Sequence, residues 1–170
     1  MEQWAGLRVL AVAEVGAMVA KSEVGFSDGP DWKEKAVTVE TLIVDDSAFA
    51  RRIIRLQLEH LGCKVVGEAD NGAQALKLFS ALKPRLVTLD LMMPAVERVD
   101  ALTAFRTIKK EAPNTAILIV TAVPFEKTRE TFTEEGALGY IVKPFTPASF
   151  DQVRIRLLRV FPELAGSGNR

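Results

Sequence analysis

Residues 41–47 read TLIVDDS, a short apolar run followed by two adjacent acids and a serine. Further short runs rich in Val, Ile and Leu follow along the chain, and they do not alternate strictly between apolar and polar residues. This pattern is typical of strands that are buried on both faces of a sheet. The expected strands cover residues 41–44, 64–69, 86–89, 116–120 and 140–142.

Segments with helical periodicity lie between the expected strands. Ser47 is a candidate N-cap for the first helix, and Gly62 is a candidate for the residue just past its end. The expected helices cover residues 47–61, a segment that opens at Asn71-Gly72, and about 99–110, 125–135 and 147–160. Five such strand–helix units predict an α/β fold, and right-handed crossovers leave few topologies. We therefore expect a doubly wound five-strand parallel sheet with strand order 2-1-3-4-5.

The composition excludes several classes of function. The 170 residues include 22 Lys and Arg against 22 Asp and Glu, so the net charge of zero does not favour nucleic-acid binding. A single Cys excludes an intrachain disulfide and a multi-cysteine zinc site, and it suits a reducing, cytoplasmic environment. A single His excludes metal sites built on a pair of histidines.

Residues 1–37 differ from the rest of the chain. Their apolar stretch, residues 9–20, contains Glu14 and is too short to span a membrane. We expect a poorly ordered or loosely packed extension here, with a targeting helix as the alternative. The other expected parts are one domain at residues 38–162 and a C-terminal tail at 163–170, with no second domain after the last helix.

Polar and charged residues stand at the expected carboxyl ends of four strands. Asp45 and Asp46 end the first strand, Asp90 follows the third, Thr121 the fourth and Lys143 the fifth. Each residue alone has an ordinary structural explanation, such as helix initiation by adjacent acids. Ligands of open α/β sheets, however, bind beyond the carboxyl ends of the strands. We therefore expect these five side chains to form one site.

Four segments around these positions read IVDDS (43–47), LDLMMP (89–94), TA (121–122) and GALGYIVKPF (136–145). In these segments the chain resembles the receiver domain of two-component response regulators, and in particular the stand-alone chemotaxis-type receivers. The spacings also fit that family, with 90 − 46 = 44 residues between acids and 143 − 121 = 22 from Thr to Lys. The resemblance covers about residues 38–161 and implies the flavodoxin-like receiver fold.

The resemblance implies that Asp90 is a phosphorylation site that receives a phosphoryl group from a histidine kinase. It also implies that Asp45, Asp46, Asp90 and the backbone carbonyl of Met92 hold Mg²⁺, a cation that prefers oxygen ligands. Without a metal, the three clustered carboxylates are expected to repel one another and so to raise their pKa values.

The resemblance also implies a conformational switch. Lys143 and Thr121 would bind phosphoryl oxygens, and a cis proline at Pro144 would aim Lys143 into the site. Tyr140 would move from an exposed to a buried position as Thr121 is drawn toward the phosphate, whereas the alternative is an ordinary strand aromatic. This shift would remodel the surface of the fourth helix, fifth strand and fifth helix, where a downstream protein target would bind.

One residue departs from the family pattern, and two others bear on the lifetime of the phosphoryl group. Arg98 stands where receivers usually have glycine, so the loop after Asp90 is expected to differ or to be strained. Met92 and Val123 flank the path by which water reaches the acyl phosphate in the family. Neither side chain can orient a water by hydrogen bonding, so we expect a long-lived phosphoryl group.

Two other functions remain open from the sequence. A degenerate receiver would act only as a docking module, which Arg98 leaves open and the complete set of Asp, Thr and Lys disfavours. A Mg²⁺-dependent phosphohydrolase usually needs an Asp-x-Asp pair, whereas Asp45 and Asp46 are adjacent. The favoured interpretation is a cytoplasmic phosphoacceptor protein and not an enzyme, beyond its own phosphorylation and slow autodephosphorylation. It has no expected membrane span and no nucleic-acid partner.

Overall fold

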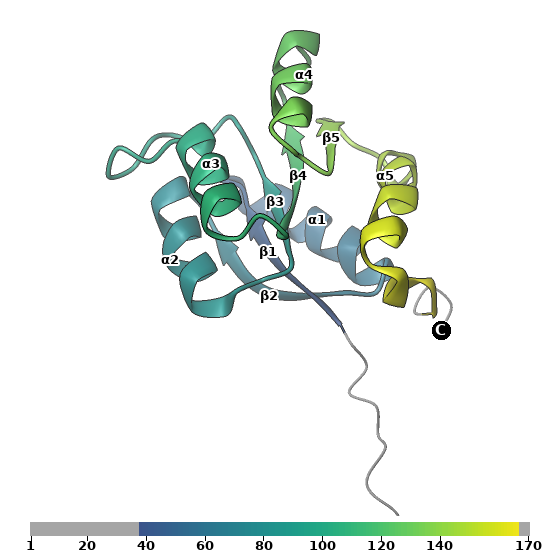
Figure 1. Cartoon of the computed structure of the whole chain (residues 1–170). Coiled ribbons are helices and arrows are strands. Elements are labelled where there is room, and N and C mark those ends of the chain that lie inside the picture. The colour runs from purple at the N-terminus through teal and green to yellow at the C-terminus, as the bar shows by residue number, and fades with distance from the viewer. Residues whose placement is uncertain (1–37, 167–170) are drawn as a thin grey trace, which may run out of the picture. The chain divides into compact units, whose positions relative to one another are not determined.

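The computed structural model describes residues 38–166, in which five parallel strands form one sheet with helices on both faces (Figure 1). The strands are β1 (Val39–Val44), β2 (Cys63–Ala69), β3 (Leu86–Leu89), β4 (Ala116–Thr121) and β5 (Gly139–Val142). They pair in parallel in the order β2-β1-β3-β4-β5. The predicted doubly wound α/β fold and its strand order are confirmed.

Five helices alternate with the strands, as the periodicity predicts. They are α1 (Ala48–His60), α2 (Gly72–Leu82), α3 (Ala101–Glu111), α4 (Glu126–Glu134) and α5 (Pro147–Val160). Ser47 caps α1 as predicted, because its hydroxyl accepts a hydrogen bond from the Ala50 N–H at 3.3 Å. This cap starts α1 directly after the acids that end β1, and so fixes where those acids leave the sheet.

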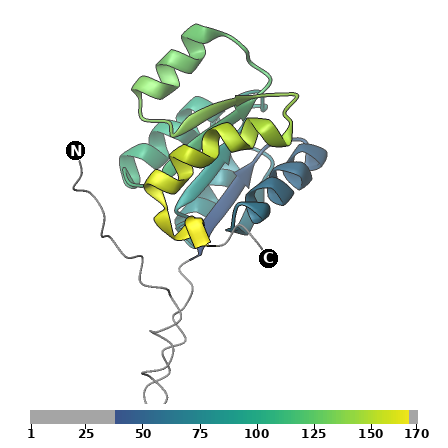
Figure 2. The ribbon, with the colours of Figure 1, turned by 90° about the vertical axis from the view of Figure 1, so that its right-hand side faces the viewer.

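The helices divide between the two faces of the sheet (Figures 1 and 2). On one face, α1 and α5 bury side chains that include Ile54, Leu58 and Phe150. On the other face, α2, α3 and α4 bury a second apolar cluster that includes Phe105 and Phe132. Because both faces are covered, the β1 and β3 side chains are buried nearly throughout, which explains the continuous apolar runs in the sequence.

Helix α4 is attached mainly through its C-terminal half. Phe132 is its buried residue and packs edge-to-face against Phe105 of α3, with ring centroids 5.0 Å apart. Just past the helix, the carboxylate of Glu135 accepts two hydrogen bonds from Arg106, at 2.8 and 2.6 Å. At the other end, Phe125 is exposed and provides no side-chain cap. The N-terminal end of α4, which follows β4, is therefore the less constrained end.

The packed structure continues beyond residue 162, where the sequence placed the boundary of a tail. A 3₁₀ helix spans Pro162–Gly166, and its Leu164 is buried in the cluster beneath α1 and α5. Glu163 pairs with Arg85, which precedes β3, and the Arg85 guanidinium lies 4.9 Å from the ring centroid of Phe161. Pro162 ends α5 as predicted, but the chain then turns back onto the core.

The expected extension at residues 1–37, and its alternative as a targeting helix, lie outside the described residues. Within residues 38–166, no helix combines the length and apolar character that crossing a membrane requires.

Candidate functional site

Three carboxylates meet at the carboxyl ends of β1 and β3. Asp45 and Asp90 are buried and Asp46 is exposed, and one carboxylate oxygen from each lies within 4.8 Å of those of the other two. The backbone N–H of Met92 donates a hydrogen bond to Asp90 Oδ1 at 2.9 Å, and that of Ser47 donates to Asp45 Oδ1 at 3.0 Å. The predicted acids therefore do come together, in an all-oxygen arrangement that can hold a hard divalent cation.

Lys143 reaches this cluster from the end of β5. Its Nζ donates hydrogen bonds to Asp45 Oδ2 at 2.5 Å and to Asp90 Oδ2 at 2.7 Å. Burial disfavours the charged ammonium, but the bonds to Asp45 and Asp90 outweigh burial and raise the pKa of Lys143. The peptide bond between Lys143 and Pro144 is cis.

The contact with Lys143 modifies the predicted repulsion between the acids. The pKa of Asp45 is raised, but the largest cause is burial, and the charge of Asp90 is the smallest of the contributions. Lys143 counters this rise through its hydrogen bond and its charge. The sequence predicted that three clustered carboxylates repel one another without a metal. It did not show that the Lys143 ammonium binds two of them, Asp45 and Asp90.

Thr121 and Tyr140 are joined through the backbone of Val123. The buried Thr121 hydroxyl accepts a hydrogen bond from the Val123 N–H at 3.4 Å, and the Tyr140 hydroxyl donates to the Val123 carbonyl at 2.7 Å. Burial of the half-buried Tyr140 raises the pKa of its hydroxyl. Two residues that the resemblance placed in one switch are therefore linked by two hydrogen bonds to a single residue.

Two arginines of α1, which sequence reasoning missed, bind Glu68 of β2, and one of them, Arg51, also binds the turn after β1. Arg51 donates through one Nη to the backbone carbonyl of Asp45 at 2.7 Å and through Nε to Glu68 at 2.9 Å. Arg55 binds the same Glu68 at 3.0 and 2.7 Å. In the predicted strand order β1 and β2 are neighbours, which places Glu68 beside the end of β1. An acid at that position could have indicated that arginines of the following helix bind there.

The family model of the response regulator receiver domain matches residues 41–153 of this sequence. The chain belongs to the response regulator receiver family. This receiver is 37% identical over 107 residues to the chemotaxis protein CheY of Thermotoga maritima, a match that covers 63% of this chain and 87% of that protein. It is 39% identical over 104 residues to CheY of Bacillus subtilis, covering 61% of this chain and 84% of the relative.

A third relative is much longer than the matched region. The protein-glutamate methylesterase/protein-glutamine glutaminase of Alkalilimnicola ehrlichii is 39% identical over 121 residues, which cover 69% of this chain but 30% of that enzyme. Among solved structures, the receiver resembles the CheX-CheY-BeF3-Mg²⁺ complex from Borrelia burgdorferi, with a TM-score of 0.63 and 27% identity over 72% of this chain and 88% of that one. The relatives thus include chemotaxis-type receivers, which are signalling proteins.

The loop after Asp90 forms a tight turn around Arg98, the position at which strain was predicted. Val96 and Val99 exchange two backbone hydrogen bonds, at 3.3 and 2.9 Å, around the pair Glu97-Arg98. Both central residues have positive φ, +53° and +64°, which is the arrangement of a type I′ turn. This conformation favours Asn and Gly, so the strain expected at Arg98 is present and extends to Glu97.

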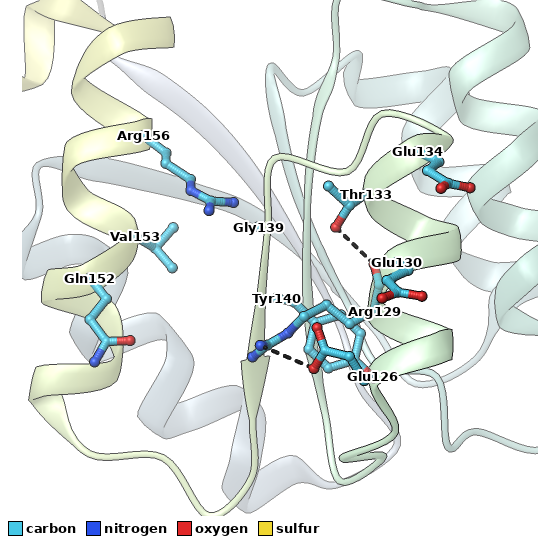
Figure 3. Close-up of a pocket in the computed structure, with 10 residues that line it drawn as sticks. All are labelled: Glu126, Arg129, Glu130, Thr133, Glu134, Gly139, Tyr140, Gln152, Val153 and Arg156. Carbon is cyan, nitrogen blue, oxygen red and sulfur yellow. Dashed lines mark hydrogen bonds and ion pairs between the residues drawn. The ribbon is translucent and has the colours of Figure 1, made fainter.

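An open groove of about 550 Å³ lies between α4 and α5 of the receiver (Figure 3). Its floor includes Gly139 and Tyr140 of β5, and α4 and α5 contribute Arg129 and Arg156 to its walls. The Arg129 guanidinium lies 5.6 Å from the centroid of the Tyr140 ring and forms an ion pair with Glu126 at 3.6 Å. Tyr140 therefore takes part both in the link to Thr121 and in this surface.

Proposed function

We propose that Asp90 accepts a phosphoryl group from a histidine kinase and that the receiver signals through the groove between α4 and α5. The observation that carries this proposal is the contact of Lys143 Nζ with both Asp45 and Asp90 beside the exposed Asp46. It brings a buried carboxylate nucleophile, a cation site and a phosphate-binding ammonium together at one end of the sheet.

The residues present fit Mg²⁺. Asp45, Asp46 and Asp90 offer carboxylate oxygens close enough for one ion, and the backbone carbonyl of Met92 would complete the protein ligands. The exposure of Asp46 leaves a side open to water, which Mg²⁺ usually retains as ligands. When bound, the ion would supply positive charge against the combined negative charge of Asp90 and the incoming phosphoryl group.

The protein side chains have separate roles in the transfer. An oxygen of Asp90 forms the new bond to phosphorus while the bond to the donor imidazole nitrogen breaks, and its electron pair stays with the imidazole. Lys143 would move its hydrogen bonds from the carboxylates to a phosphoryl oxygen, and the Thr121 hydroxyl would donate a hydrogen bond to another phosphoryl oxygen. Asp90 keeps the hydrogen bond from the Met92 N–H during this step.

The signal would pass from Thr121 through Val123 to Tyr140. A movement of the Thr121 hydroxyl toward the phosphate would break or reorient its hydrogen bond with the Val123 N–H. The carbonyl of the same Val123 accepts a hydrogen bond from the Tyr140 hydroxyl, so the movement would reach Tyr140. Tyr140 lines the groove, so its position would change the surface that a protein target contacts.

Incubation with acetyl phosphate and Mg²⁺, followed by intact-mass and peptide mass spectrometry, tests the proposal. We expect a labile adduct of about 80 Da on Asp90, the mass of one phosphoryl group. Asp90→Asn is the matched control, because its single amide oxygen can keep one of the two hydrogen bonds that Met92 and Lys143 donate to Asp90, and an amide does not form a stable acyl phosphate. Rapid turnover of a small phosphomonoester would instead support a phosphohydrolase. A wild-type chain without any adduct would support a docking module, and an equal adduct in Asp90→Asn would remove Asp90 from its role.

A further inference from the structure

The turn that joins β1 to α1 presents two of the three acids. Asp45 is fixed on several sides, since its N–H donates to the Ala69 carbonyl at 3.0 Å and its carboxylate binds Ser47 and Lys143. Asp46 is different, because its exposed carboxylate accepts no hydrogen bond from any residue between 38 and 166. The direction in which Asp46 points therefore depends on the peptide unit that connects it to Asp45.

Arg51 holds that peptide unit. One Nη of Arg51 donates to the Asp45 carbonyl at 2.7 Å, and its Nε is tied to Glu68 of β2 at 2.9 Å. The Arg51 side chain is 18% exposed, so this contact is shielded from much of the solvent. A guanidinium is planar and rigid, so binding at two points fixes both its own position and that of the carbonyl.

We propose that Arg51 is a positioning residue that sets the affinity of the Asp45–Asp46–Asp90 cluster for a divalent cation. It acts by fixing the peptide unit between Asp45 and Asp46. The inference rests on the proposed function, because it presumes that this cluster binds Mg²⁺. Arg51 does not touch the ion or the phosphoryl group, so its effect is indirect.

Charge and position predict opposite effects for the loss of Arg51. A cationic guanidinium close to the cluster repels a divalent cation, so on charge alone its removal would strengthen binding. Loss of a fixed ligand geometry weakens binding, and removal of groups that orient metal ligands commonly costs tenfold or more in affinity. The direction of the change therefore distinguishes the two effects.

Arg55 provides a matched control on the same helix. It binds the same Glu68, at 3.0 and 2.7 Å, and its removal changes the net charge by the same amount. Its other hydrogen-bond partner is Glu59, and among the described residues it forms no hydrogen bond or ion pair with Asp45. Arg51→Met and Arg55→Met thus share the loss of one positive charge and of the contact with Glu68, which is one hydrogen bond for Arg51 and two for Arg55. Only Arg51→Met also loses the bond to the Asp45 carbonyl.

The experiment is a titration of the full chain with MgCl₂, followed by the backbone amide signals of Asp46 and Met92 in two-dimensional NMR spectra. We expect Arg51→Met to bind Mg²⁺ about tenfold more weakly than wild type. Arg55→Met should stay within about twofold, because the charge of the half-buried Arg55 is already paired with Glu68 and Glu59 and is largely screened. Arg51→Lys keeps the charge but cannot bind two partners as a planar fork, and should also bind more weakly.

Each outcome decides the inference. Unchanged or tighter binding by Arg51→Met overturns it, and so does an equal loss in both methionine variants, which would indicate a general effect of the Glu68 contacts. If the Arg51→Met spectrum shows an unfolded chain, Arg51→Lys decides in the same way. A wild-type chain that binds no Mg²⁺ would overturn the proposed function and this inference together. Normal wild-type binding with unchanged Arg51 variants would overturn this inference alone.

Discussion

The ammonium group of Lys143 contacts two carboxylates, Asp45 at 2.5 Å and Asp90 at 2.7 Å. In Lys143→Ala both contacts are lost, but Asp90 keeps its backbone bond to Met92. We expect this variant to accept phosphate from acetyl phosphate and to transmit the change poorly. The phosphorylation-dependent shifts of the Val123 and Tyr140 amide signals should fall by about half or more, since coupling between sites is commonly worth about 1–3 kcal/mol.

Lys127→Ala is the control for this prediction. Lys127 is an exposed lysine of α4, and its ammonium forms no hydrogen bond with the acids of the described site. Shifts of wild-type size in phosphorylated Lys143→Ala would show that the lysine has no part in the switch.

Met92 and Val123 are expected to set the lifetime of the acyl phosphate. The Met92 side chain is 60% exposed beside Asp90, and Val123 is half-buried beside Thr121. Neither can orient an attacking water. In Met92→Asn/Val123→Glu, loss of phosphate after donor removal should be about tenfold faster, which corresponds to roughly 1.4 kcal/mol of barrier.

The apolar pair Met92→Leu/Val123→Ile serves as the control, and its phosphorylated form should decay at the wild-type rate. Decay of the wild type within seconds, or equal decay in all three proteins, would mean that these side chains do not limit hydrolysis.

The acids, Thr121 and Lys143 were predictable because they stand at strand ends and in motifs that resemble a known family. The pairing of Lys143 with two acids in the absence of a metal was not predictable, because it depends on distances between three loops. The Arg51–Glu68 contact was missed for a similar reason. Both residues are of types that are common on exposed surfaces, and 17 positions separate them in the chain.

Among the elements, the Val96–Val99 turn stores conformational strain. Glu97 and Arg98 both have positive φ, which costs a residue other than glycine about 1–3 kcal/mol. Glu97→Asn/Arg98→Gly places the residues that type I′ turns prefer. We expect the free energy of unfolding, measured by urea denaturation, to rise by about 1 kcal/mol, less than the full strain because glycine also loosens the unfolded chain.

Glu97 also forms an exposed ion pair with Lys77 at 3.0 Å, so Glu97→Gln is needed as a control. That substitution removes the ion pair without relieving the backbone, and should change stability by less than about 0.5 kcal/mol. A double variant that is no more stable than wild type would show that the turn carries no strain.

Element bounds followed the sequence wherever a capping residue or a proline marks them, as Ser47 does for α1. The 3₁₀ helix at Pro162–Gly166 was not predicted, because a proline after a helix indicates only that the helix stops. Whether the next residues pack depends on an apolar surface elsewhere in the fold. Here that surface is the buried cluster that Leu164 joins. No local pattern reports such a surface.

For the molecule as a whole, Glu68 links stability to pH. Burial opposes its ionisation, but hydrogen bonds from Arg55 and Arg51 outweigh burial and lower the pKa of Glu68. A carboxyl group with a lowered folded-state pKa stabilises the fold above its unfolded-state pKa, and this stability is lost as pH falls through the folded-state value. We therefore expect Glu68→Gln to be less stable than wild type at pH 7, and the difference to shrink below about pH 4.3, the ordinary pKa of glutamate.

Urea unfolding at a series of pH values between neutral and strongly acidic checks this expectation. Glu130→Gln removes an exposed carboxylate that has no ion pair within residues 38–166, and its curve should run parallel to wild type. A constant difference between wild type and Glu68→Gln across the acidic range would contradict the assigned contribution of Glu68.

The one-sided attachment of α4 makes this helix a lever. Its fixed end is Phe132 against Phe105, and its free end, at Phe125, adjoins the loop that carries Val123. Seven residues of helix separate the two ends, a length of about 10 Å. A tilt of about 10° about Phe132 would then swing the free end by about 2 Å, much further than the movement of one hydroxyl that could start it. The distance between the α4 and α5 walls of the groove would then change. A partner bound in the groove would respond to phosphorylation through the shape of the groove, without contacting the phosphate.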